Sequence, residues 1–149
     1  SLAALAGGSA GDAIRLLNHD GLPLYAELVS AIEGLPTINR QVALRLADSC
    51  VGRNAEVRFA MTLDLIDLFL SRAARAGLIG EPSAQGAPGE ARLLARIAPN
   101  DMAARRWAAL QQELTTRSRH GRAVNLDPAA LILDMIFKIE ETAQGVAAA

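Results

Sequence analysis

Two carboxylates, Asp64 and Asp67, are the residues whose type and spacing most readily suggest chemistry. They lie three positions apart in a segment with helical periodicity, so both side chains would project from one helix face and could reach one cation. Two carboxylates alone are too few to hold Mg²⁺ without a phosphate ligand. We therefore favour a solvated polar stripe and predict no metal site. An enzyme that uses this pair is the weakest of the functional alternatives.

The two histidines and the single cysteine give no catalytic set. His19 and His120 lie at the edges of predicted helices, without the partner histidine of a zinc protease and without a cysteine partner. Cys50 lies on an apolar helix face, where a free thiol is often simply buried. No histidine lies near a serine in a nucleophile motif, so we predict no catalytic residue.

A glycine-rich run at residues 7–11 precedes the first predicted helix. Glycines before a helix N-terminus can hold a phosphate group, but this run lacks the Gly-Lys-Ser/Thr of a P-loop. We predict no independent nucleotide site and no cofactor.

Arginines form the one concentration of basic side chains, in the last third of the chain. Cations near a helix C-terminus suit the helix dipole, which is the simpler explanation. The same side chains could instead contact an acidic partner or DNA. The members of this group are Arg105, Arg106, Arg117, Arg119 and Arg122.

Charge and composition restrict the class of protein. The 149 residues carry 15 basic and 16 acidic side chains, a balance that argues against a dedicated nucleic-acid coat protein. One cysteine builds no disulfide framework, so we expect a cytoplasmic location. No uncharged apolar run approaches the length of a membrane span, and the N-terminus lacks the basic region of a secretory signal. The chain begins at Ser1, so we expect a boundary inside a longer protein.

Apolar residues recur with the helical period in almost every segment, and no segment shows a sustained period of two. This pattern predicts an all-α fold, a compact bundle of about five to seven helices. The longest apolar arc should belong to the central helix. A segment rich in glycine and proline, 77–88, is expected to be a mobile loop. The expected helices span 10–18, 21–33, 40–51, 54–76, 89–98, 101–116 and 128–145.

Several helix boundaries carry side-chain signals. Asp127 followed by Pro128 is the clearest helix start, an N-cap with proline at the first helical position. The segment 117–122 is expected to be where the sixth helix decays. Asp134 and Lys138 are expected to form an ion pair across one helical turn. The other predicted N-caps are Ser9, with Asp12 three residues later, and Asn39, and the sixth helix is expected to begin after Asn100.

The segment Gly8-Ser9-Ala10-Gly11-Asp12-Ala13-Ile14 resembles the sensor-2 helix of the clamp-loader branch of AAA+ ATPases. In motor subunits of that branch the pattern reads Gly-Ser-x-Arg-Asp-Ala-Leu, and the arginine contacts bound ATP. This chain has Gly11 at the arginine position, and Arg15 lies one helical turn further on. The substitution is similar to the delta-prime subunits of bacterial DNA polymerase III, the non-hydrolysing members of the clamp loader. Loss of the sensor arginine implies loss of the cationic phosphate contact.

Two further stretches carry the same resemblance. The residues from Leu46 to Arg72 are similar to the central collar helix of that family, and those from Asn125 onward to its last helix. The resemblance implies that 1–18 is the end of the AAA+ lid domain and 19–149 the C-terminal helical collar domain. The Walker motifs, the zinc module and the arginine finger would lie upstream of Ser1.

Collar domains of this family assemble subunits and do not catalyse a reaction. The resemblance therefore implies a non-catalytic oligomerisation domain that assists loading of the sliding clamp in DNA replication. Its partners would be the motor subunits and the delta subunit, with an indirect association with the clamp and primer–template DNA. The alternative is an unrelated helical regulator or adaptor with a small-molecule pocket, as a monomer or a homodimer.

Overall fold

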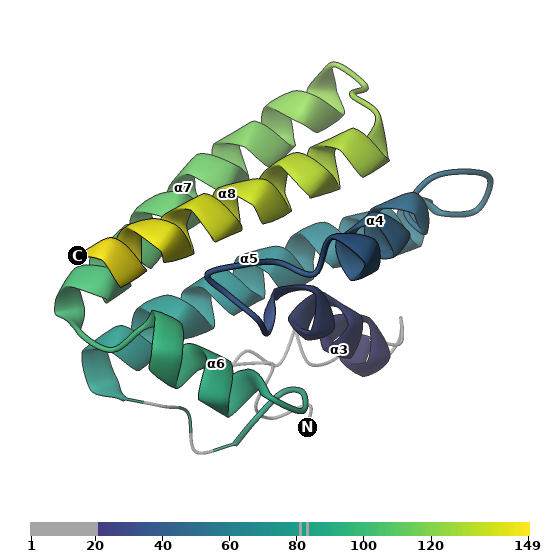
Figure 1. Cartoon of the computed structure of the whole chain (residues 1–149). Helices are drawn as coiled ribbons and strands as arrows, with labels where there is room; N and C mark the ends of the chain where they lie inside the picture. Colours follow the sequence, from purple (N-terminus) through teal and green to yellow (C-terminus); the bar gives the residue numbers. More distant parts are fainter. Residues whose placement is uncertain (1–20, 81, 83) are drawn as a thin grey trace.

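The structure is a computed structural model, and it describes residues 21–80, 82 and 84–149 (Figure 1). The expected helix at 10–18 lies outside these residues. So do the glycine run, Gly11, Arg15, His19 and the expected lid segment at 1–18.

Helices alone make up the secondary structure of the described residues, so the predicted all-α fold is confirmed. Figure 1 shows α7 and α8 side by side on one side of the molecule, with α3 and α6 on the other and α5 between them. A short turn at 124–127 joins α7 to α8 as an antiparallel pair. The helices are α3 (Gly21–Ile32), α4 (Arg40–Asp48), α5 (Glu56–Ile79), α6 (Glu90–Ile97), α7 (Asp101–Ala123) and α8 (Pro128–Ala148).

The predicted N-caps Asn39 and Asp127 are confirmed, and Asn100 caps α7 in the same way. Asn39 accepts a hydrogen bond at its side chain from the backbone N–H of Val42 at 3.1 Å. Asn100 and Asp127 accept equivalent bonds, each at 2.9 Å, at the starts of α7 and α8. Each bond satisfies one of the backbone donors that a helix N-terminus leaves unpaired. These local signals explain why the sequence located the helix starts closely.

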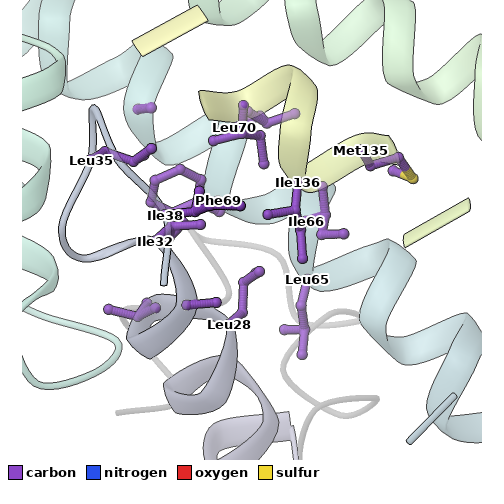
Figure 2. Packing of buried hydrophobic residues seen from close by; sticks show 14 of the residues in the cluster. Leu28, Ile32, Leu35, Ile38, Leu65, Ile66, Phe69, Leu70, Met135 and Ile136 are labelled. Atoms are coloured by element: carbon purple, nitrogen blue, oxygen red, sulfur yellow. The ribbon is translucent and has the colours of Figure 1, made fainter. Parts of the chain in front are cut away.

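Helix α5 is the central helix, as its wide apolar arc predicted, and it packs against α3, α6, α7 and α8. Its side chains Ile66, Phe69 and Leu70 are fully buried. Figure 2 shows them close to Ile32 of α3 and Ile136 of α8, which come from opposite sides of α5. One continuous hydrophobic core therefore joins the helices, and the bundle is stabilised from both sides of α5.

The loop between α3 and α4 is fixed by side chains from two distant helices. From α6, Arg96 donates through Nε to the carbonyl of Leu35 at 2.8 Å. From α8, Glu140 accepts a bond from the backbone N–H of Ile38 at 3.0 Å. Leu35 and Ile38 are themselves buried in the core. The loop therefore belongs to the packed body of the bundle.

The sequence-based prediction of a loop at 77–88 placed the start of this loop too early. Helix α5 runs through Gly77 and ends at Ile79. A Cβ at Gly77 would lie 2.6 Å from the carbonyl oxygen of Asn100 and 2.8 Å from Cβ of Ala104. The glycine therefore allows α5 and the start of α7 to approach closely, rather than ending the helix.

The expected decay of the sixth helix at 117–122 is also wrong. Helix α7 continues through this segment to Ala123. Its Gly121 is buried against α8, and a Cβ there would lie 3.0 Å from Cδ2 of Leu131. Its carbonyl accepts a bond from the backbone N–H of Leu126 at 2.9 Å. Tertiary packing on α8 thus stabilises a helical turn that the local sequence favours weakly.

The expected ion pair between Asp134 and Lys138 does not form. Asp134 instead accepts a hydrogen bond from Arg117 of α7, with an Nη1–Oδ2 distance of 2.9 Å. Lys138 lies nearest to Glu141, with an Nζ–Oε2 distance of 3.9 Å. The helix lying alongside thus supplies a closer cation than the next turn of α8.

Candidate functional site

A buried ion pair joins α5 to α6. Arg72 donates to Glu90 through two atoms, with Nε–Oε2 at 2.8 Å and Nη2–Oε1 at 2.7 Å. The side chain of Glu90 is fully buried and that of Arg72 almost so. Two-point contact between guanidinium and carboxylate is the geometry that best offsets the cost of removing both charges from water.

Further donors complete the surroundings of this carboxylate. The hydroxyl of Tyr25, on α3, donates to Oε2 of Glu90, and the backbone N–H of Gly86 donates to Oε1 at 2.7 Å. Arg72 also donates to the carbonyl of Ala84 at 3.0 Å. We call Tyr25, Arg72 and Glu90 the buried triad. It connects α3, α5, α6 and the loop before α6 at one point.

The environment of the triad shifts the pKa of each member. Burial by itself raises the pKa of Glu90, but hydrogen bonds from Arg72, Gly86 and Tyr25 outweigh it and lower the pKa. Burial and the neighbouring Glu90 raise the pKa of Tyr25 well above its usual value. The pKa of Arg72 is raised by Glu90 despite the opposing effect of burial. At neutral pH the triad thus holds a carboxylate, a guanidinium and a neutral phenol.

The carboxylate of Glu90 is fully buried, so the triad joins the helices inside the bundle. The triad was not predicted from the sequence. The signal was present at Arg72, a charged residue within the apolar arc of the central helix, since a charge there needs a buried partner. The identity of that partner is a matter of tertiary structure.

The predicted carboxylate pair lies instead on an open groove between α5 and α7. Asp64 and Asp67 are exposed, as the solvated-stripe interpretation predicted. Arg119 and Arg122 of α7 line the same groove, together with Ser118. The cavity measures about 240 Å³ and is open to solvent. We call it the α5–α7 groove. Its remaining lining residues are Leu63, Ile66, Leu70, Leu114, Thr115 and Met135.

Asp67, on the acidic side of the groove, is hydrogen-bonded to side chains of α7. Asp67 accepts a hydrogen bond from Nε2 of Gln111 at 3.1 Å and a longer one from the hydroxyl of Thr115 at 3.4 Å. Within the described part of the chain, no three His, Cys, Asp or Glu side chains gather where a metal ion could be held.

The five arginines of the sequence-based group do not form one patch. Arg105 and Arg122 are 17 positions apart on α7, which is about 25 Å along a helix axis. Arg117 is paired with Asp134 and, at 3.5 Å, with Glu113 of its own helix. Arg119 makes no ion pair with any described residue. The group therefore divides into separate local environments, and two of its members, Arg119 and Arg122, line the α5–α7 groove.

The remaining candidates fit structural roles. Cys50 is buried as predicted, with Sγ 3.4 Å from the hydroxyl of Thr62. His120 is exposed in the last turn of α7. Arg40 lies over the ring of Phe137 at 5.4 Å from its centroid, which partly shields an exposed aromatic side chain.

One end of the bundle exposes a group of large apolar side chains. Leu78 and Ile79 at the end of α5 are 61% and 73% exposed, and Met102 at the start of α7 is 61% exposed. The close approach at Gly77 brings these two helix ends together. We call Leu78, Ile79 and Met102 the apolar end. A cavity of about 670 Å³ beside it is lined by Gly77, Pro99, Asn100, Asp101, Met102, Ala103, Arg106, Val146 and Ala149.

Among the described residues, every helix is too short or too polar to cross a lipid bilayer. Comparison of the chain with protein-family models, with curated proteins and with solved structures gives no match.

Proposed function

We propose that this chain is a collar domain of a bacterial clamp loader, of the delta-prime type, which holds neighbouring subunits together and catalyses no reaction itself. The proposal begins from the resemblance of residues 8–14 to a sensor-2 helix with Gly11 in place of arginine. A helical bundle with a continuous core is consistent with it, because a collar domain must fold around its own core before it meets its neighbours.

The observation that carries the proposal is the apolar end. Three large side chains that are more than half exposed sit together on a bundle whose core is already complete. Exposed apolar groups of this kind on a stable domain are typical of protein–protein contact surfaces. The open groove and the buried triad offer no comparable support for a catalytic step, since one is exposed to water and the other is closed to it.

In this role the domain would hold the neighbouring subunits in fixed positions. A rigid bundle that fixes its neighbours would let the motor subunits move against a constant reference while the sliding clamp is opened. Partners would be the motor subunits and the delta subunit. Contact with the clamp and with primer–template DNA would be indirect, and the setting would be the bacterial cytoplasm.

Size exclusion with light scattering tests the proposal. The chain is measured alone and then mixed with the C-terminal region of the motor subunit from the same organism. We expect a monomer alone and a stable mixed complex in the mixture. If the pair does not associate, the full set of partner subunits is added, because a collar contact can require several subunits at once.

An absence of association with the full set would overturn the proposal. The regulator or adaptor alternative then gains weight, and the 670 Å³ cavity, within the size range of small-molecule sites, is the place where its ligand would bind. That alternative expects a two-fold homodimer and an increase in melting temperature with ligand. A homodimer that excludes the motor subunit would favour it directly.

A further inference from the structure

The apolar end has exposed arginines beside it on both of its helices. Arg75 lies three and four positions before Leu78 and Ile79, so it projects from the same side of α5 one turn earlier. Arg105 lies three positions after Met102 on α7. Both arginines are exposed, and neither forms an ion pair with another described residue. We call Arg75 and Arg105 the basic border.

The surroundings of the apolar end carry little negative charge. Within the last two turns of α5 and the first two turns of α7, Asp101 is the only acidic side chain, and it suits the positive end of the α7 dipole. A further arginine, Arg106, lies against Gly145 near the end of α8, and it lines the cavity beside the apolar end. The surface therefore combines an apolar centre with a net positive charge.

A protein segment with apolar side chains and neighbouring carboxylates is complementary to this surface. Leu78, Ile79 and Met102 are each more than half exposed, so a partner can cover them without opening the core. Burial of these side chains would supply binding free energy, and carboxylates beside the basic border would orient the partner and speed its association.

A second copy of the chain is disfavoured at the same surface. In a two-fold dimer the same surface meets itself, which would bring two basic borders together. Like charges that face one another across an interface oppose association. The contact therefore favours a different protein.

Nucleic acids and lipid surfaces also match this end of the bundle less well. Phosphates would attract the basic border, but the three apolar side chains have no partner on a phosphate backbone. Single strands stack their bases on aromatic side chains, and none of the three is aromatic. Helices that lie on a lipid surface bury one long apolar face, whereas here the ends of two helices supply the apolar groups.

We propose that the apolar end binds an acidic, amphipathic segment of a partner protein, whose carboxylates lie beside Arg75 and Arg105. The inference rests on the proposed function, because the first partner to test is the motor-subunit region. It adds the chemistry of the partner surface, which the collar role by itself leaves open.

Titration calorimetry tests the charge requirement, with the motor-subunit region or, where that region alone does not bind, with the assembled partner subunits. We expect Arg75→Glu and Arg105→Glu each to weaken binding about three- to tenfold at low salt, because reversal replaces a modest attraction with repulsion. The double variant should weaken binding at least tenfold. Arg75→Lys keeps the charge and should change the Kd less than twofold.

Arg119→Glu is the matched control. Arg119 is also exposed on α7 and lies about 21 Å further along the helix axis than Arg105. This variant should change the Kd less than twofold. Thermal melts check that every variant is as stable as the wild type.

Salt separates the basic border from the apolar centre. The Kd of the wild type should rise with sodium chloride, because exposed charges are screened. The double variant Arg75→Glu/Arg105→Glu should lose or reverse this dependence, whereas Ile79→Ser should bind more weakly at every salt concentration and keep it. A complex whose Kd responds neither to salt nor to the two reversals overturns this inference and leaves the proposed function standing.

The remaining outcomes identify other occupants. No complex with any clamp-loader subunit overturns both the inference and the proposed function. Binding to phosphatidylglycerol vesicles that is lost in Ile79→Ser would identify an anionic lipid surface. A homodimer that Ile79→Ser dissociates would identify a second copy of the chain, and a primed DNA duplex bound through Arg75 would identify a nucleic acid. Each of these three results overturns the inference.

Discussion

Arg72 reaches the carboxylate of Glu90 with two nitrogen atoms, at 2.8 and 2.7 Å, inside the bundle and 18 positions away along the chain. Both side chains are buried, so water could not solvate either charge if its partner were removed. The free energy of unfolding should therefore depend strongly on this pair, which gives the first prediction.

Removal of one partner should cost far more than removal of both. Glu90→Ala or Arg72→Ala leaves a buried charge unpaired, and we expect each to lower the free energy of unfolding by about 3–5 kcal/mol. The double variant Arg72→Met/Glu90→Leu replaces the pair with apolar side chains and should cost less than either single variant. Urea unfolding measures all three. A double variant whose cost equals the sum of the single costs would contradict the coupling.

The lowered pKa of Glu90 predicts an acid-dependent stability. A carboxyl group with a lower pKa in the folded state stabilises the protein above its unfolded pKa, and this stabilisation is lost as the pH falls through the folded pKa. The difference in unfolding free energy between the wild type and Glu90→Gln should therefore be largest near pH 7. This difference should become smaller as the pH falls below the usual pKa range of glutamate. A difference that stays constant from pH 7 to pH 3 would contradict the assigned shift.

Tyr25 predicts a corresponding loss at high pH. Its pKa is raised in the folded state, so its contribution is complete below the ordinary tyrosine pKa and is lost as the pH rises through the folded value. Tyr25→Phe removes a donor to the buried carboxylate and should cost about 1–3 kcal/mol at pH 7. The stability of the variant should also decline less than that of the wild type as the solution becomes alkaline. Thermal melts from pH 7 to pH 11 compare the two proteins.

Two helical glycines should respond oppositely to alanine. Gly77→Ala places a methyl group 2.6 Å from the backbone of Asn100, so the clash should outweigh the gain in helix propensity of about 1 kcal/mol. Gly145→Ala meets only the flexible end of Arg106, which can move aside, and should be neutral or stabilising. Melting temperatures test the pair. A stabilised Gly77→Ala variant would contradict the tight contact between α5 and α7.

The apolar end predicts a change in assembly without a change in stability. Ile79→Ser should weaken association with the motor-subunit region, because an exposed apolar contact is lost. The isolated chain should melt within a degree or two of the wild type, since the side chain is already in water. Val57→Ser, at the opposite end of α5 and also exposed, is the matched control. Equal binding by both variants would remove the apolar end from the interface.

The helices and their starts could be predicted because their signals are local. Asn39 and Asp127 bond to a backbone three residues away, so the sequence around them suffices. The helical register of α5 was likewise readable from its own apolar residues. The partners of Arg72 and Arg117 could not be predicted, because α6 and α8 bring them in from elsewhere in the chain.

The same reasoning explains the two wrong helix ends. Gly77 was interpreted as the start of a loop rich in glycine and proline, and the segment 117–122, which contains Gly121, as the decay of the sixth helix. Each instead lies where another element approaches closely, which is visible only in three dimensions. The candidate site followed the same pattern, since Asp64 and Asp67 were identified as an exposed pair while the arginines opposite them were assigned to a separate group.

The backbone N–H of Gly86 has an unusual position for a loop amide. It is buried and donates to Glu90 of the buried triad, so its exchange requires this hydrogen bond to break. Amide hydrogens in loops ordinarily exchange with deuterium within seconds, whereas those sealed by a core exchange only through large openings of the fold. The segment before α6 should therefore retain one slow-exchanging hydrogen, and its exchange rate would report how often the junction of α3, α5 and α6 opens.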